Sequence, residues 1–163
     1  MALPVTFTAG NVLEAAQLNS NFEFTYADYI AYTPTITGWT AGNMTFSTKY
    51  SVTGDMVNYQ GSLTFGTTSA VTATSLTVSL PVAQVDGANV SIFGVGTWRD
   101  ISTSVQVAGY CQVFGSGPLN LFWLDPETVP LAVRLEPWTT AATLPFTFAT
   151  GDQVSWNVTY PKA

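Results

Sequence analysis

The sequence has few charged residues and no histidine. Charged side chains make up 9% of the 163 residues, and only four of them are basic, whereas an ordinary soluble domain has roughly a quarter. The net charge of -6 makes nucleic acid and anionic membranes poor partners, because both are bound through clustered positive charge. The absence of histidine removes the commonest metal ligand and the usual general base. We therefore expect no metal and no cofactor.

The single cysteine excludes an internal disulfide. Cys111 lies in a strand-like run with no histidine to activate it, which favours a buried apolar side chain over a nucleophile. The N-terminus lacks the basic and apolar regions of a signal peptide, and no run reaches the ~18 apolar residues of a membrane span. We expect a chain that is neither exported by the Sec pathway nor inserted in a membrane.

The carboxylates give little indication of an active site. Asp125 and Glu127 are close in sequence, but Asp before Pro favours a turn, and nothing specific marks the two as a glycosidase pair. Asp55 and Asp152 each follow a glycine, which is typical of hairpin turns. The sequence contains no calcium loop of the D-x-D-x-D-G type. We expect a protein without enzymatic activity.

Residues 11–32 carry the helical pattern of the sequence. Asn11 and Glu14 have the spacing of a capping box. The apolar residues that follow recur every three or four positions, on one stripe of a helix about 30 Å long. An apolar stripe of this kind must be buried by packing, and we expect it to pack against copies of this chain or against another protein. The alternative is that it packs against the β domain of the same chain. The residues expected to form the attachment and oligomerisation surface are Leu13, Ala15, Leu18, Asn19, Phe22, Tyr26 and Tyr29.

Beyond Tyr32 the pattern changes to that of β-strands, so we divide the chain into residues 1–32, an N-terminal lead-in and helix, and 33–163, a β domain. Residues 44–65 alternate about a turn at Gly54, which predicts an antiparallel hairpin. Roughly eight strands without an intervening helix predict an antiparallel β-sandwich of jelly-roll type. A loop is expected at 66–73, and further strands are expected in the segments 76–80, 90–98, 104–114, 119–124, 131–135 and 145–160.

The surface of this chain must be mostly uncharged, since 47% of its residues are hydrophobic. Such a surface suits a subunit of a symmetric assembly, in which neighbouring subunits cover apolar area. Exposed tryptophans would be candidates for stacking on sugar rings, but the pattern favours the core or a subunit interface for them. The tryptophans concerned are Trp39, Trp98, Trp123 and Trp138.

The segment FTAGNVLEAAQLNSNF, from Phe7 to Phe22, resembles the N-terminal region of bacteriophage tail-fibre and minor tail proteins. The segments Met44 to Ser69, Ser79 to Val82 and Phe148 to Tyr160 look like their β domains. Glu14 departs from the pattern, which often has Thr there. The resemblance implies that the N-terminal segment attaches to the virion, while the β domain trimerises and faces outward.

The resemblance leads us to expect a short tail fibre, or a minor tail or baseplate appendage, that is located in the virion and contributes to host attachment. The expected partners are the same chain in a homotrimer, other virion proteins through the N-terminal segment, and a host-surface glycan or protein. The alternative is a capsid decoration or head fibre protein that stabilises the shell. A carbohydrate-binding module is a third alternative, disfavoured by the uncovered helical stripe.

Overall fold

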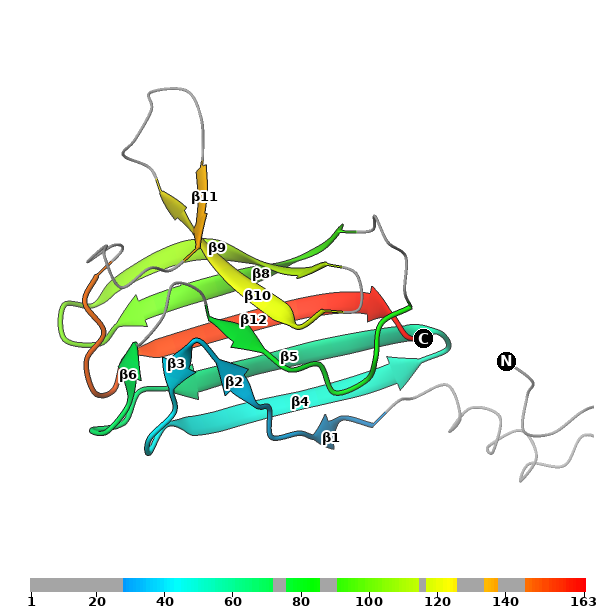
Figure 1. The fold of residues 1–163 in the computed structure, drawn as a ribbon, viewed down its shortest axis with the longest axis horizontal. Coiled ribbons are helices and arrows are strands. Elements are labelled where there is room, and N and C mark those ends of the chain that lie inside the picture. Colours follow the sequence, from blue (N-terminus) through cyan, green and yellow to red (C-terminus); the bar gives the residue numbers. More distant parts are fainter. Residues whose placement is uncertain (1–27, 72–75, 86–90, 115–116, 126–133, 138–145) are drawn as a thin grey trace, which may run out of the picture.

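The computed structural model describes residues 28–71, 76–85, 91–114, 117–125, 134–137 and 146–163 (Figure 1). Within these residues the fold is mainly β, and no helix is present. The strands, in chain order, are β1 (Ile30–Ala31), β2 (Ile36–Thr37), β3 (Trp39–Thr40), β4 (Thr45–Thr53), β5 (Met56–Thr64), β6 (Ala70–Val71), β7 (Thr77–Val78), β8 (Ser91–Asp100), β9 (Val105–Phe114), β10 (Leu119–Asp125), β11 (Arg134–Pro137) and β12 (Gln153–Pro161).

Most strands belong to one antiparallel sheet that curls back on itself. Its order is β1-β4-β5-β12-β8-β9-β10-β7-β2, and β11 pairs with β10. The curl brings β2, β7 and β10 in front of β4, β5 and β12 (Figure 1). Strands β3 and β6 form a separate two-stranded sheet. The last strand, β12, is inserted between β5 and β8, so the centre of the sheet depends on contacts between distant parts of the chain.

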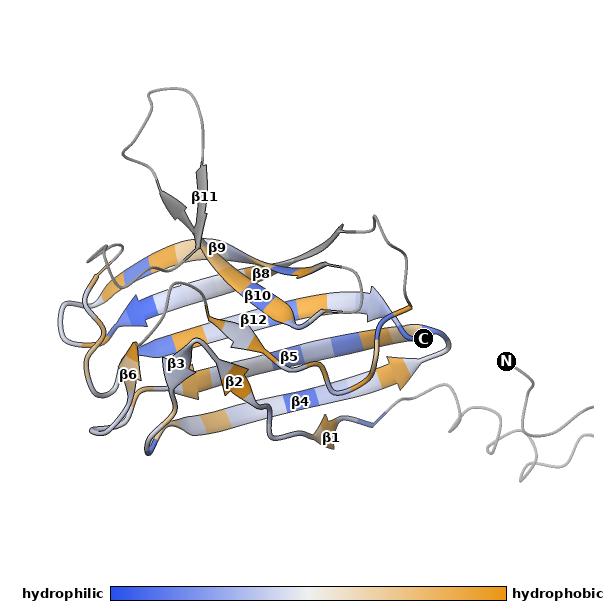
Figure 2. Cartoon of the chain, in the orientation of Figure 1, coloured by the Kyte–Doolittle hydropathy of each residue, from blue (hydrophilic) through white to orange (hydrophobic). Residues whose placement is uncertain are grey.

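The hairpin of β4 and β5 confirms the prediction for residues 44–65. Gly54 forms its turn with φ of 61°, a conformation that glycine adopts without steric cost. The register pairs Thr53 with Met56 and runs without interruption to Thr45 and Thr64. Apolar side chains alternate with polar ones along the strands, which Figure 2 shows as separate orange bands. One face of the hairpin therefore packs on the core, and the other faces outward.

The core lies inside the curled sheet. Its largest fully buried side chains come from strands on both sides of the curl, and complete burial of a Leu or Val side chain contributes roughly 1.5–3 kcal/mol. These side chains are Trp98, Tyr59, Tyr160, Leu63, Leu76, Leu119, Leu121, Val57, Val78, Val113, Val154 and Val158.

Tyr32 links the two sides of the curl. Its ring makes edge contacts with Tyr50 and Tyr59, at centroid distances of 6.2 and 5.9 Å. Its hydroxyl lies 2.7 Å from Ser79 Oγ and donates to the carbonyl oxygen of Leu80 at 3.1 Å. These contacts join β4 and β5 to the segment that follows β7.

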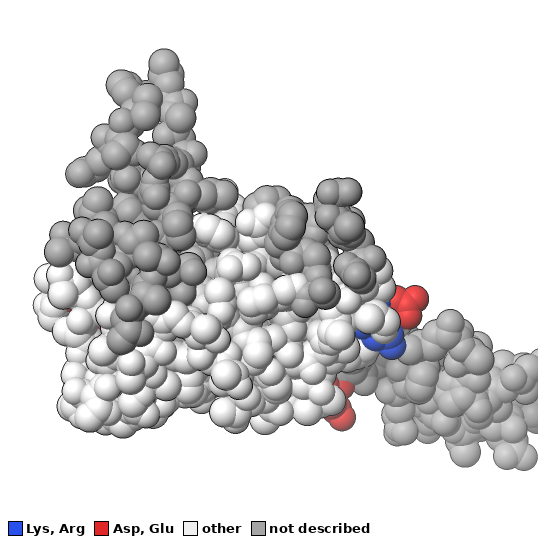
Figure 3. Space-filling view, in the orientation of Figure 1, with Lys and Arg blue, Asp and Glu red and all other residues white. Residues whose placement is uncertain are grey.

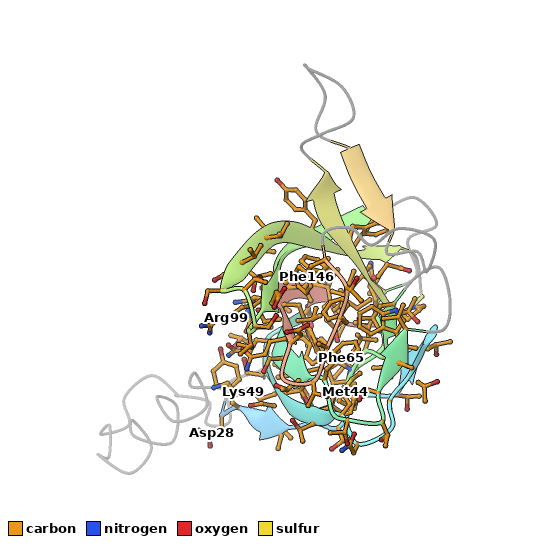
Figure 4. The ribbon with its side chains drawn as sticks, turned by 90° about the vertical axis from the view of Figure 1, so that its left-hand side faces the viewer. Asp28, Met44, Lys49, Phe65, Arg99 and Phe146 are labelled. Atoms are coloured by element: carbon orange, nitrogen blue, oxygen red, sulfur yellow. The ribbon has the colours of Figure 1, made fainter. Side chains whose placement is uncertain are left out.

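An aromatic cluster fills the end of the core nearest β3. The rings of Phe65 and Phe148 stack with centroids 4.5 Å apart. Trp39 contacts both rings edge-on, at 5.1 and 5.0 Å, and Phe146 contacts Phe148 at 5.0 Å. Figure 4 shows Phe65 and Phe146 within the ribbon. Edge and offset ring pairs of this kind contribute about 0.5–1.5 kcal/mol beyond the burial of their area.

Two buried carboxylates organise the loops at the ends of β8 and β12. Asp100 accepts hydrogen bonds from the backbone N–H groups of Ser102 and Thr103 and from the Ser102 hydroxyl. Asp152 accepts from the N–H groups of Ile101 and Ala149, at 3.0 and 2.7 Å. Asp152 therefore does more than form the expected turn, because its carboxylate also holds the loop between β8 and β9.

Two sequence-based predictions are wrong in detail. The helix expected to run to Tyr32 does not, because Ile30 and Ala31 are extended and pair with Tyr50 and Lys49 of β4. Pairing with a strand edge satisfies backbone groups that a helical turn would satisfy internally. The loop expected at 66–73 contains β6, which pairs with β3. The rest of the predicted helix, 11–27, lies outside the described residues.

Candidate functional site

The outer face of the sheet arranges polar side chains in rows that cross the strands. Side chains that alternate with the core residues point outward, and the register aligns them from strand to strand. One row, called here the hydroxyl row, has small hydroxyl side chains on β4, β5, β12 and β8. Its members are Ser47, Ser62, Ser155 and Thr97. The adjacent row, called the flanking row, continues to β9 and consists of Lys49, Gln60, Asn157, Val95 and Tyr110.

Two hollows lie between these rows and form what we call the outer hollow. The larger, about 350 Å³, is lined over β4, β5 and β12, and the smaller, about 130 Å³, is lined over β12 and β8. Ser155 and Trp156 line both, so the two hollows adjoin each other at β12. Strands lie ~4.8 Å apart, so the outer hollow crosses about 14 Å of sheet. The larger hollow is lined by Ser47, Thr48, Lys49, Gln60, Gly61, Ser62, Ser155 and Trp156.

Aromatic side chains lie at both ends of the outer hollow. At the β4 end, the ring of Tyr29 lies under Lys49, whose Nζ is 4.6 Å from the ring centre. The Tyr29 hydroxyl donates to Asn58 Oδ1 at 3.2 Å, and the side chain is 50% exposed. At the β8 end, Val95 and its cross-strand partner Tyr110 are 63% and 39% exposed. A ligand in the hollow would therefore meet polar groups in the middle and apolar surface at each end.

The three rows of the outer face carry positive charge although the chain as a whole is acidic, and exposed Asp28, which precedes Tyr29, lies on the same side (Figure 4). Lys49 belongs to the flanking row, and Arg99 belongs to a third row on the far side of the hydroxyl row. Figure 4 shows both on the same side of the ribbon. None of the three rows contains a carboxylate. The opposite face, over β2, β7 and β10, has almost no charged side chain among its described residues (Figure 3). The third row consists of Thr45, Thr64, Gln153, Arg99 and Gln106.

Glycines on the inner side of the same strands make room for tryptophans. A Cβ atom on Gly61 would lie 2.6 Å from the Trp156 ring, and one on Gly109 would lie 1.9 Å from the Trp98 ring. The Trp156 indole N–H points towards the Tyr59 hydroxyl, but neither atom has a hydrogen bond of normal geometry. Burial raises the pKa of Tyr59 well above its ordinary value. The wall beneath the outer hollow is thus a tightly packed aromatic layer.

Two of the tryptophans considered as sugar contacts do not lie on this face. Trp39 and Trp98 are buried in the core, with 5% and 1% of their surface exposed. A ring that is enclosed in the core has no free face for a ligand. The position of Trp138 and the side chain of Trp123 lie outside the described residues.

Of the expected attachment residues, the structure describes Tyr29. It lies in an extended segment next to β1 and not on a helix. Sequence analysis placed Tyr29 in a contact surface but did not identify the outer hollow beside it. One outward-facing serine on each of β4, β5 and β12 is the available signal, although only the register shows that Ser47, Ser62 and Ser155 are neighbours. The remaining expected attachment residues, outside the described part, are Leu13, Ala15, Leu18, Asn19, Phe22 and Tyr26.

Reactive and metal-binding groups are not found at the outer hollow. Cys111 is fully buried on the inner side, and burial raises the pKa of its thiol to about 12. The described residues contain no group of three or more His, Cys, Asp or Glu side chains that could hold a metal ion. The polar side chains of the lining carry hydroxyls, two amides and an ammonium, which suit reversible hydrogen bonding.

The comparison with protein-family models found no match for this chain. The comparisons with curated proteins and with solved structures found none either. Within the described residues, no helix has the length and apolar character needed to span a membrane.

Proposed function

We propose that this chain is a non-enzymatic structural protein of a bacteriophage virion, a short tail fibre or a minor tail or baseplate appendage that contributes to host-surface attachment. The sequence resemblance in residues 7–22 and in three segments of the β domain supports this proposal. The observation that carries it is the exposure of apolar side chains on the hairpin of β8 and β9. The exposed side chains at the turn of this hairpin are Ile101 and Val105, which are 42% and 45% exposed.

The exposed hairpin supports assembly with other subunits. Single exposed apolar residues are ordinary, but two that flank one turn form a small surface of the kind that subunit contacts cover. Few charged side chains are present to keep such a surface soluble, because only 9% of the chain is charged. We propose a homotrimer, with the N-terminal segment attached to other virion proteins.

The finer architecture that we propose is a two-layered sandwich of the jelly-roll type. The contacts of Tyr32 with Ser79 and Leu80 support two facing layers. A second contact close by supports them, because the Tyr160 hydroxyl donates to the carbonyl oxygen of Val82 at 3.0 Å.

The first experiment is the mass of the native particle, which should be that of a trimer; a monomer at high concentration would contradict the proposal. The second compares virions with and without the protein. Virions that lack it should keep intact heads and fail to adsorb to the host. If instead they adsorb normally and their heads burst on heating, the chain is a capsid decoration protein.

A further inference from the structure

We propose that the outer hollow is a binding site for an oligosaccharide, which lies across strands β4, β5, β12 and β8. This inference rests on the host-attachment function proposed above and names the class of ligand that this face takes. It depends on three properties of the hollow: its hydrogen-bonding groups, its shape and its charge.

The lining offers donors and acceptors in the same small area. Ser and Gln side chains both donate and accept hydrogen bonds, as do the hydroxyl groups of a sugar. Ser155 and Thr97 bond to each other, with their hydroxyl oxygens 2.5 Å apart. The structure shows no hydrogen bond between the side chains of Ser47, Gln60 or Ser62 and another described residue. These three side chains are therefore available to a ligand.

The shape of the hollow suits an extended hydrophilic chain. Sites for apolar small molecules enclose most of the ligand and are lined mainly by hydrophobic side chains, whereas this hollow lies on the outer face and is lined by Ser, Thr, Gln and Lys. Its length of about 14 Å across the strands accommodates a short chain of sugar rings. Tyr29 and Tyr110, both exposed, offer flat apolar surface at its two ends for the C–H faces of the terminal rings.

The charge of the face favours an acidic sugar at the β4 end. Lys49 lines the larger hollow, and the three rows on this face contain no carboxylate. A carboxylate on the ligand would form a charge-assisted hydrogen bond with Lys49 Nζ, which is stronger than a bond between neutral groups. Sugars without a charge would use the hydroxyl and amide groups alone. We therefore infer a preference for oligosaccharides that contain a uronic acid over their neutral counterparts.

The test is binding of the purified full chain to an array of neutral and uronic acid-containing oligosaccharides, followed by calorimetric titration of those that bind. Ser62→Leu fills the hollow, and Gln60→Ala removes an amide; each should weaken binding about tenfold, the effect of losing one or two hydrogen bonds. Thr64→Leu and Gln106→Ala are the matched controls, because they lie on the same face outside the lining. Both controls should bind as the unmodified chain does.

Charge is tested with Lys49→Gln, with Arg99→Gln as its control. Lys49→Gln should weaken binding of acidic oligosaccharides about tenfold and leave binding of neutral ones within about twofold. An equal loss for both classes would overturn the preference for acidic sugars. All variants should keep the melting temperature of the unmodified chain, since the substituted side chains face outward.

Absence of binding across the array would overturn the inference, as would equal affinities of the Ser62→Leu and Thr64→Leu variants. Adsorption assays separate this failure from failure of the proposed function. If virions lacking the chain fail to adsorb while virions carrying Ser62→Leu adsorb normally, the function stands and the site is wrong. If virions lacking the chain adsorb normally, the attachment function is wrong whatever the array shows.

Discussion

Replacing Gly61 by alanine tests the packing of the aromatic layer beneath the outer hollow. The added Cβ would lie 2.5 Å from Thr48 Cγ2 and 2.6 Å from the Trp156 ring. Overpacking of this kind costs about 1–3 kcal/mol. The same substitution restricts the unfolded chain, which contributes about 0.4–1 kcal/mol of stability where space is available. The cost of the clash should therefore exceed the stabilisation from the restricted unfolded chain, and the free energy of unfolding should fall by about 1–2 kcal/mol.

The assay is thermal and urea unfolding of Gly61→Ala, alone and combined with Trp156→Phe. In a chain of 163 residues, 1 kcal/mol corresponds to about 2–4 °C, so the melting temperature should fall by roughly 2–8 °C. Trp156→Phe has a smaller ring and should absorb part of the clash, so Gly61→Ala should cost less in that background. An unchanged or raised melting temperature of Gly61→Ala, or an equal loss in both backgrounds, would refute the packing argument.

Three further predictions concern buried polar groups. Asp152→Ala removes the acceptor of two backbone N–H groups and should lower the free energy of unfolding, measured by urea titration, by about 1–3 kcal/mol. Asp152→Asn keeps one acceptor oxygen and should lose less free energy of unfolding in the same titration. Equal losses in the two variants would contradict the role of the carboxylate. Hydrogen bonds from Ser102 and Thr103 lower the pKa of Asp100, so its contribution to stability is present above the unfolded pKa and is lost as the pH falls through the lower folded pKa. Melting curves recorded down to pH 2 should show a steeper acid loss for the unmodified chain than for Asp100→Asn, and parallel curves would count against this. Burial raises the pKa of Cys111 to about 12, so its thiol should not react with a thiol-specific reagent at pH 8 in the folded chain. The thiol should react after denaturation. Rapid reaction in the folded state would contradict this prediction, because it would show that the thiol is accessible.

The long strands were largely predictable because each has a local signal. Alternation about Gly54 predicted β4 and β5, and alternation towards the C-terminus predicted β12, which runs from Gln153 to Pro161. The two-residue strands were not separately predictable, since a pair such as Ala70–Val71 is too short to show a period. Ile30–Ala31 was placed in a helix because the apolar pattern of period 3.6 extends to Tyr29, directly before it. Pairing with β4 decided its conformation.

The candidate site was only partly predictable. Sequence analysis considered the tryptophans as sugar contacts in case they were exposed but favoured the core or a subunit interface for them, and the fold buries Trp39 and Trp98 in the core. A tryptophan has the same appearance in a sequence whether its ring faces a ligand or the core. The glycine at position 109 accommodates the Trp98 ring, but the two residues become neighbours only through the pairing of β8 and β9.

By itself, the sequence determined the low charge, the two faces of each long strand and the position of the β4–β5 turn, because these properties depend on composition or on residues a few positions apart. Only the tertiary structure decided that β12 lies between β5 and β8, and that Ser47, Ser62 and Ser155 form one row. A shift of one residue in any of these pairings would move its side chains to the opposite face. The register is fixed by burial of the inner side chains across strands far apart in sequence, so the outer hollow exists only in the assembled sheet.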